Sequence, residues 1–211
     1  MKPFPTRRLL LAGTGTFLLP VRAAFAAGLA VTPSQTEGPF YPTAFPADAD
    51  SDLVQVRGAP ARAIGTVLHL DGRVLNAEGR RIERATVEIW QSDSLGLYDH
   101  PRQPGRDRRD IAFQGYGRLS TGPDGRYAFR TLAPVAYPGR APHIHFKVTT
   151  ADGRKLTSQF YLAGNAQNDG DFVFRSAVRD PRQRERIEMR LAEANGVENG
   201  AFATTMDIVI G

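Results

Sequence analysis

Short strand-like runs separated by turn residues constrain the fold of this chain more than any other feature. From residue 63 onward, alternating or β-branched runs recur between turns rich in glycine, aspartate and asparagine. The runs cover residues 64–70, 86–91, 117–120, 127–130, 143–149, 158–162 and 204–210. Many short strands with regular turn signals are typical of two packed antiparallel sheets. The sequence therefore predicts an all-β fold, a two-sheet β-sandwich with long loops over residues 63–211.

Three Asp-Gly pairs and one capping pattern set the expected boundaries within this domain. The pairs at 71–72, 124–125 and 152–153 are each expected to form a turn with positive φ. Asp180 and Pro181 suit the start of a helix, and Asn195-Gly196 suits its end, so one short helix is predicted in the C-terminal half. Residues 27–62 carry prolines and polar residues and are predicted to be an N-terminal arm and polar connector.

Residues 1–26 have the composition of an export signal. Lys2, Arg7 and Arg8 precede an apolar stretch, and residues 24–26 give an A-x-A cleavage pattern. Glycines, threonines and a proline interrupt the stretch, whereas a membrane anchor needs about 20 uninterrupted apolar residues. The adjacent arginines fit a twin-arginine signal. We therefore expect an exported, periplasmic protein with no membrane attachment after cleavage.

Composition narrows the function classes once the leader is set aside. The 27 basic residues of the whole chain include four in the leader, which leaves 23 against 22 acidic residues. A nearly neutral mature domain gives no support for nucleic-acid binding, because the electrostatic footprint of such a protein lies on the folded domain. The chain has no cysteine, so disulfides and thiolate metal sites are excluded.

The sequence His143-Ile144-His145 is the first candidate for chemistry. On a strand, residues two apart face the same side, so both imidazoles would project together and could chelate a metal. A purely structural pair is equally compatible with this pattern. A zinc hydrolase would require a third His or a carboxylate, and a facial-triad oxygenase would require one carboxylate. Composition alone leaves both open.

Four separate stretches of the chain carry a family resemblance: residues 32–41, residues 85–98 with Trp90 and Tyr98, residues 117–131, and residues 140–146. Residues 159–161 and 207–210 extend the match to nearly all of the chain after the leader. In these stretches the chain resembles the intradiol ring-cleaving dioxygenases, and most closely the iron-bearing chain of the protocatechuate 3,4-dioxygenase branch. The resemblance implies an oxidoreductase of aromatic catabolism that uses O₂ and a catechol-type substrate.

The same resemblance implies that Tyr98, Tyr137, His143 and His145 hold a non-haem ferric ion. A trivalent cation stabilises phenolate strongly, so tyrosines with an ordinary pKa near 10 can ligate as anions. Tyr137 would be the axial ligand that leaves when the catechol binds through both oxygens. Cleavage between the two hydroxyl-bearing carbons would give a cis,cis-muconate-type product. The substrate supplies all the electrons, so no nicotinamide or flavin is implied.

Further residues receive roles from the resemblance. Arg140 would place a guanidinium against the substrate ring, and Gln159 would hydrogen-bond nearby. Tyr41 is a candidate for the mouth of the substrate pocket, whereas Trp90 is expected to be core packing. The presence of all four ligands indicates an iron-bearing chain by the same resemblance. Such a chain could form a homo-oligomer or pair with a related chain, and the sequence leaves both open.

The chain departs from the family pattern between Tyr137 and His143. Only five residues separate them, where the protocatechuate enzymes carry a longer stretch with a tryptophan. We expect a more open pocket that accepts a bulkier or differently substituted catechol. Two competing interpretations keep the fold and change the function: a zinc-dependent hydrolase, and a non-catalytic transthyretin-like β-sandwich that only binds a ligand or partner.

Overall fold

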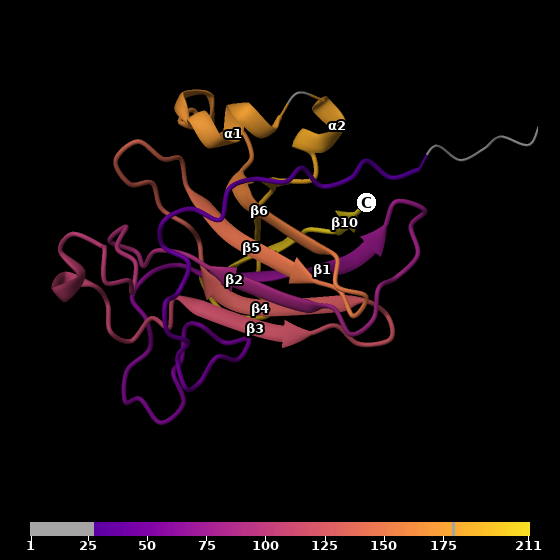
Figure 1. Cartoon of the computed structure of the whole chain (residues 1–211). Helices are drawn as coiled ribbons and strands as arrows, with labels where there is room; N and C mark the ends of the chain where they lie inside the picture. The colour runs from indigo at the N-terminus through magenta and orange to yellow at the C-terminus, as the bar shows by residue number, and fades with distance from the viewer. Residues whose placement is uncertain (1–27, 179) are drawn as a thin grey trace, which may run out of the picture.

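The computed structural model of the chain describes residues 28–178 and 180–211 and shows two five-stranded sheets packed face to face (Figure 1). The first sheet has the strand order β3-β2-β5-β6-β7. Its strands are β2 (Thr86–Trp90), β3 (Tyr116–Ser120), β5 (His143–Thr149), β6 (Lys155–Leu162) and β7 (Glu188–Met189). All its pairs are antiparallel except β6 with β7.

The second sheet is built around the long strand β1. Its strands are β1 (Val67–Asn76), β4 (Arg126–Leu132), β8 (Ala192–Glu193), β9 (Phe202–Thr205) and β10 (Ile208–Ile210). β1 pairs with β4 in antiparallel fashion on one side, and with β9 and then β10 in parallel on the other. The predicted two-sheet β-sandwich is therefore confirmed.

The main core lies between the two sheets and follows the alternation of the strands. Leu70 of β1 faces it from the second sheet, while Ile144 of β5 and Phe160 of β6 face it from the first, all fully buried. Because side chains alternate across a strand, His143, His145 and Gln159 project from the opposite, outer face of the first sheet. These three are also buried, so the first sheet is covered on both faces.

The helical prediction for residues 180–195 is wrong beyond its first turn. Asp180 does cap a helix through the backbone N–H of Arg182, but this helix, α2 (Pro181–Arg184), has only four residues. The chain then becomes extended because Ile187 is fully buried and its carbonyl accepts a hydrogen bond from the Tyr161 N–H at 2.7 Å. Pairing with β6 thus overrides the local helical pattern.

A second short helix, α1 (Phe172–Ala177), was not predicted. Asp171 caps it, since the side chain of Asp171 accepts from the N–H groups of Val173 and Phe174. The described residues also contain two single-turn 3₁₀ helices, η1 (Arg106–Arg108) and η2 (Asn168–Gly170). In Figure 1, α1 and α2 lie at one end of the molecule, next to the end of β6.

The turn predicted at Asp71-Gly72 is also wrong, because both residues lie inside β1. Gly72 does not have positive φ, unlike Gly125 and Gly153 in the other two predicted turns. A Cβ at Gly72 would collide with the backbone carbonyl of Met206, where the chain passes from β9 to β10. The glycine is therefore required by a close backbone approach, which sequence alone presents in the same way as a turn.

The N-terminal arm is tied to both sheets. Thr32 bonds to Val209 twice, once from its own N–H to the Val209 carbonyl and once by accepting from the Val209 N–H. Leu53 and Val54 are fully buried in the main core, and Leu53 N–H donates to the Arg130 carbonyl at 2.8 Å. Residues 32–54 therefore pack as part of the sandwich.

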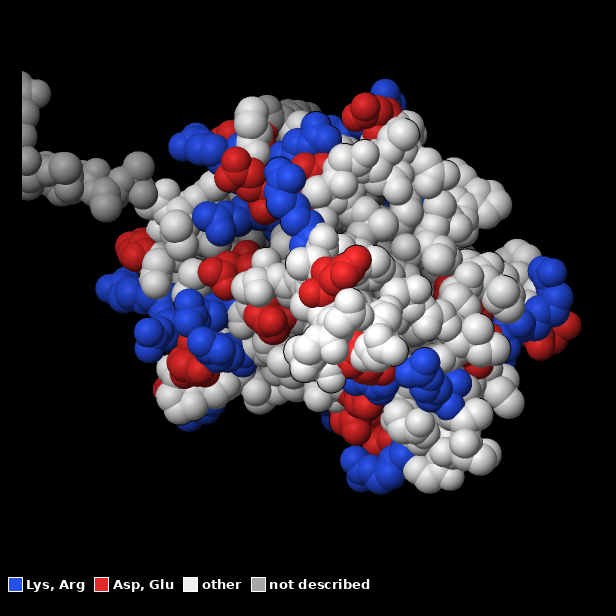
Figure 2. Space-filling view, turned by 180° about the vertical axis from the view of Figure 1, so that it is seen from behind, with Lys and Arg blue, Asp and Glu red and all other residues white. Residues whose placement is uncertain are grey.

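The predicted export signal, residues 1–26, lies outside the described residues. None of the helices that the structure describes is long and apolar enough to cross a membrane. On the face shown in Figure 2, basic and acidic side chains alternate over the surface, with uncharged areas between them.

Candidate metal centre

The two histidines of β5 form the base of a buried polar cluster. His143 and His145 are each 2% exposed, and their Nε2 atoms lie 3.2 Å apart on the outer face of the first sheet. Ile144 between them points into the main core. The strand period of two thus produces the shared orientation that the His-x-His spacing predicted.

Two tyrosines from different loops complete this cluster. Tyr98 follows β2 and is 3% exposed, and its hydroxyl lies 3.4 Å from Nε2 of His143. The Tyr137 hydroxyl lies at the same distance, 3.4 Å, from the same nitrogen. Tyr137 itself is only partly buried. The structure therefore brings together all four side chains predicted as ligands.

The tautomer of His143 leaves a nitrogen lone pair turned toward the two tyrosine hydroxyls. Nδ1 of His143 donates to the Ala141 carbonyl at 2.6 Å, so Nε2 is the unprotonated nitrogen when the ring is neutral. Burial lowers the pKa of His143 to about 3 and holds the pKa of His145 well below its ordinary value. Both imidazoles are therefore neutral, and each has an unprotonated nitrogen that can bind a metal ion.

The donor set fits a metal ion. Metal bonds to nitrogen and oxygen of about 2.0–2.2 Å place neighbouring ligand atoms roughly 3 Å apart, and the cluster has spacings of 3.2–3.4 Å. With Nε2 of His143 unprotonated, the two Nε2 atoms repel one another unless a proton or a cation is shared between them. Nδ1 of His145 is also buried without a hydrogen-bond partner among the described residues.

The type of donor favours a highly charged cation. Burial, more than any neighbouring group, raises the pKa of Tyr98 and of Tyr137 above 10, so phenolate forms here only beside strong positive charge. Within residues 28–178 and 180–211, no three His, Cys, Asp or Glu side chains gather as a metal site. The carboxylate or third histidine that a zinc hydrolase or a facial-triad oxygenase requires is thus not provided in the described part of the chain.

A tight turn connects Tyr137 to Arg140. The Arg140 N–H donates to the Tyr137 carbonyl at 2.9 Å, with Pro138 and Gly139 between them and Gly139 at φ 80°. Proline followed by a residue with positive φ is the pattern of a type II turn. The turn returns Arg140 to the cluster, where its Nη1 lies 3.4 Å from the Tyr137 hydroxyl.

Arg140 connects the cluster to three further side chains. Its Nη2 donates to Oε1 of Gln159 at 2.5 Å, and its Nε donates to the Asp171 carboxylate at 2.9 Å. The Tyr161 hydroxyl donates to the same Gln159 oxygen at 2.9 Å. Arg140 and Gln159 were expected near the centre, whereas Asp171 and Tyr161 were missed. Only the capping position of Asp171 before a short apolar helix could have drawn attention to it.

The N-terminal arm covers the other side of the cluster. Phe40 stacks on Tyr98 with ring centroids 4.8 Å apart, and Trp90 stacks on His145 at 4.9 Å. Gly38 lies against His145, since a Cβ there would be 3.3 Å from the imidazole Cε1. Trp90 is buried as expected, but it also supports a candidate ligand. Phe40 and Gly38 were missed because nothing local in the arm indicates what it packs against.

Tyr41, which the sequence suggested for the pocket mouth, is turned elsewhere. Its hydroxyl donates to the Glu88 carboxylate at 2.7 Å, and the same oxygen accepts from the Tyr116 hydroxyl. Lys147 lies over the Tyr41 ring at 4.3 Å. Tyr41 therefore anchors the arm to the first sheet and contacts Trp90 edge-on.

A small hollow opens beside Tyr137. Its volume is about 210 Å³. It is lined by Tyr137, Gly139, Arg140, Ala141, Gln167, Gly170 and Asp171. Pro138 and Gly139 on its rim are exposed, and a Cβ at Gly139 would meet nothing within 4 Å. The cluster is thus accessible from the side next to Tyr137 and Arg140.

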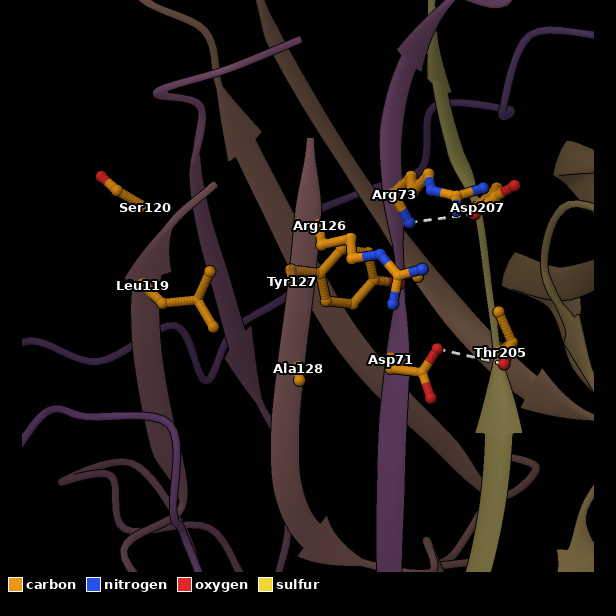
Figure 3. A pocket seen from close by; sticks show the side chains of 10 residues that line it. Asp71, Arg73, Leu119, Ser120, Arg126, Tyr127, Ala128, Thr205 and Asp207 are labelled. Atoms are coloured by element: carbon orange, nitrogen blue, oxygen red, sulfur yellow. Dashed lines mark hydrogen bonds between the residues drawn. The ribbon is translucent and has the colours of Figure 1, made fainter. Parts of the chain in front are cut away.

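A hollow of about 790 Å³ lies beside the second sheet; it is lined by residues of β1, β4 and β9 and by Leu119 and Ser120 of β3, at the edge of the first sheet (Figure 3). Two hydrogen bonds join residues of its lining. The Thr205 hydroxyl donates to Asp71 at 3.1 Å, and the Arg73 N–H donates to Asp207 at 2.9 Å. No member of the tyrosine and histidine cluster lines this hollow.

Comparisons with known proteins agree with this geometry. A family model described as Dioxygenase matches residues 36–210. The protocatechuate 3,4-dioxygenase beta chain of Burkholderia cepacia is 31% identical over 169 residues, which cover 76% of this chain and 71% of the relative. The solved dioxygenase domain of a carbohydrate-binding fusion protein from Streptomyces sp. SirexAA-E superposes with a TM-score of 0.66 at 28% identity, covering 86% of this chain and 98% of that domain.

Catechol 1,2-dioxygenase 1 of Acinetobacter lwoffii is 30% identical over 161 residues, which cover 68% of this chain. The match spans about half the length of that relative. The extent of the family match and the identity to the Burkholderia relative confirm the resemblance recognised in the sequence and give no support to a non-catalytic binding module. The chain belongs to the intradiol ring-cleavage dioxygenase family.

Proposed function

We propose that this chain is a non-haem Fe(III) intradiol dioxygenase whose metal ligands are Tyr98, Tyr137, His143 and His145. The observation that carries the proposal is the convergence of the two tyrosine hydroxyls and Nε2 of His145 on Nε2 of His143, at 3.2–3.4 Å from it. Neutral buried imidazoles and phenols that ionise only beside strong positive charge suit a trivalent ion. Bound there, ferric iron would supply a Lewis-acidic centre for a catechol and its reaction with O₂.

Tyr137 and Arg140 would handle the charge on the substrate. Tyr98 is buried, whereas Tyr137 is partly exposed at the hollow, so Tyr137 is the tyrosine that can move aside and hold a proton taken from a catechol. The Arg140 guanidinium, 3.4 Å from the Tyr137 hydroxyl, would stabilise negative charge on the substrate oxygens and ring. Gln159 accepts from this guanidinium and limits its orientation.

The substrate is proposed to be a catechol that is bulkier than, or differently substituted from, protocatechuate. The wall between Tyr137 and Arg140 is a single tight turn, whose two middle residues are exposed. The hollow beside it is therefore bounded by a low rim at Gly139. A low rim removes the steric penalty that a longer wall would impose on ring substituents.

The metal is tested by colour. Protein reconstituted with ferric iron should absorb visible light through charge transfer from two tyrosinates, and Tyr98→Phe should shift or abolish this band. Tyr127→Phe is the matched control, because Tyr127 is equally buried but bonds only to the Met206 carbonyl in the second sheet. A colourless iron-replete preparation would refute the ferric tyrosinate site and favour a zinc hydrolase or a binding module.

The substrate is tested by oxygen uptake with a panel of catechols. Simple and bulky catechols should be turned over at comparable rates, with consumption of one O₂ for each ring and formation of a muconate-type product. A strong preference for protocatechuate would contradict the open-rim proposal while leaving the reaction class intact. Absence of uptake with every catechol in the panel would contradict the enzymatic proposal itself.

Export and assembly are proposed from the sequence alone. The arginine pair at residues 7 and 8 suggests twin-arginine export to the periplasm after folding. Replacing both by lysine should retain the protein in the cytoplasm, and cell fractionation measures this directly. The chain is also proposed to form a homo-oligomer or to pair with a related chain, which sedimentation of the purified protein and of a cell extract would distinguish.

A further inference from the structure

Asp171 is a buried carboxylate with four hydrogen bonds, at the junction of α1 and the candidate metal centre. Its Oδ1 accepts from the N–H groups of Val173 and Phe174, at 2.9 and 3.0 Å. Its Oδ2 accepts from Nε of Arg140 and from the N–H of Ala141, both at 2.9 Å. The Asp171 side chain is fully buried, and that of Arg140 is 17% exposed.

The carboxylate is held in its charged form. Burial alone would raise its pKa, but the backbone N–H groups of Phe174 and Ala141, together with the Arg140 guanidinium, lower the pKa below its ordinary value. A buried carboxylate with this many donors is fixed in orientation, because rotation would leave charge and N–H groups unpaired. One of its oxygens therefore presents a fixed acceptor to Nε of Arg140.

This acceptor determines where the rest of the guanidinium points. The group is planar, so fixing Nε against Asp171 directs Nη2 to Gln159 at 2.5 Å and Nη1 to the Tyr137 hydroxyl at 3.4 Å. The tight turn at Tyr137 restrains the backbone of Arg140, but four side-chain torsions remain free in a long side chain. The contact with Asp171 supplies the restraint that the turn does not.

We infer that Asp171 is a positioning residue that holds the Arg140 guanidinium at the substrate side of the metal centre. This inference rests on the proposed function for its catalytic consequence, although the positioning itself concerns only residues of this chain. Asp171 would act through Arg140 and would not touch the substrate. It also connects the N-terminus of α1 to the reaction site.

The second capping aspartate separates positioning from helix capping. Asp180 caps α2 by accepting from the Arg182 N–H, and its other side-chain contact is with the exposed Arg182 guanidinium instead of a residue of the metal centre. Asn at position 171 can still cap α1 through its oxygen, while its NH₂ group would face two other donors, Nε of Arg140 and the N–H of Ala141. Asp171→Asn therefore removes the contact with Arg140 and keeps the cap, and Asp180→Asn is the matched control.

The kinetic test is a double-mutant cycle in the iron-loaded protein. Asp171→Asn should lower kcat about 10-fold, in the range seen when support of a metal site is removed, with a smaller change in KM, and Asp180→Asn should change kcat less than twofold. In an Arg140→Met background, adding Asp171→Asn should lower kcat further by less than about twofold, because its effect passes through Arg140. Equal losses in both backgrounds, or no loss in the first, would overturn the inference.

A measurement on metal-free protein is independent of turnover. In protein labelled with ¹⁵N-arginine, the Arg140 Nε–H signal, identified by its loss in Arg140→Met, should exchange slowly with solvent. Asp171→Asn should speed this exchange at least about tenfold, and Asp180→Asn should not; circular dichroism checks that each variant is folded. Unchanged exchange in Asp171→Asn would overturn the positioning role. If no catechol is turned over, the proposed function fails, and the exchange result alone then decides the role of Asp171.

Discussion

The two sheets contribute comparable inner faces to the core and very different outer faces. The first sheet carries Trp90, His143, His145 and Gln159 on an outer face that the arm and α1 bury. The outer face of the second sheet carries charged side chains such as Asp71 and Arg73, which line the hollow of Figure 3 together with residues of β3. Both sheets therefore bury a core face, whereas the proposed metal centre lies on the sheet whose outer face is also shielded from water, where electrostatic interactions are stronger.

The largest expected effect separates the histidines of the two sheets. His145→Ala should remove a ligand of the proposed ferric ion, abolish the visible band and lower kcat/KM by more than about 100-fold, beyond the loss from an outer-shell change. His69→Ala in β1 is the control, because Nε2 of His69 lies 3.3 Å from the Glu198 carboxylate and His69 is outside the cluster. Iron content and visible absorption measure the result. Equal iron loss in both variants would contradict the proposal that, of the two sheets, only the first provides metal ligands.

A large but symmetric effect is expected in the core. Ile144 of β5 and Leu70 of β1 are both fully buried between the sheets. Truncation of either to alanine should lower the free energy of unfolding by about 2–5 kcal/mol, from lost burial and the cavity left behind. Denaturant unfolding of the metal-free variants measures this. A loss confined to one variant would show that the sheets do not contribute equally.

A smaller effect concerns the pH dependence of the free energy of unfolding and is expected next to the second sheet. The hydrogen bonds from Arg130 lower the pKa of Glu198 from its ordinary value of 4.5 to about 2. The ionised form is favoured in the folded state, so its stabilisation is complete above pH 4.5 and is lost as the pH falls toward 2. Glu198→Gln should remove about 1 kcal/mol of this pH dependence.

Unfolding free energies measured between pH 6 and pH 2 test this assignment. Glu193→Gln, at an exposed position in β8, is the control and should leave the slope unchanged. An unaltered slope in Glu198→Gln would mean that other carboxylates carry the acid sensitivity of the fold.

The smallest effect is expected in the hollow of the second sheet. Asp71 is exposed and pairs only with neighbours in the same sheet, so Asp71→Asn should change stability by no more than about 0.5 kcal/mol. It should change kcat/KM less than twofold. A loss of tenfold or more in oxygen uptake would show that the outer face of the second sheet takes part in function after all.

Local patterns predicted the strands and the two histidines, but long-range contacts decided the rest. The alternation around Ile144 placed His143 and His145 on one face, because strand geometry is local. Tyr98 lies 45 residues from His143 in the sequence and Tyr137 lies six, both in loops with no strand period to orient them, and only the family resemblance connected them to that face. Asp171 was missed for the same reason, since its contact with Arg140 spans 31 residues.

The errors have a common physical origin in tertiary contacts. The sequence around Ile187 has the composition of a surface helix, yet pairing with Tyr161 in β6 draws it into an extended conformation. Gly72 resembles a turn residue, yet it is needed where the Met206 carbonyl approaches β1. In both places a tertiary contact decides the local conformation, and the periodicity of the sequence does not reveal that contact.

The stacking of Trp90 on His145 makes intrinsic tryptophan fluorescence a probe of the candidate metal centre. Trp90 is the sole tryptophan of the chain, and its ring lies nearly parallel to that of His145, with 13° between the planes. Tryptophan emission therefore comes from one indole that is in contact with one candidate ligand, with no background from other tryptophans. Quenching of this emission during titration with ferric iron would report loading of the centre in real time, without labels, in the native sequence.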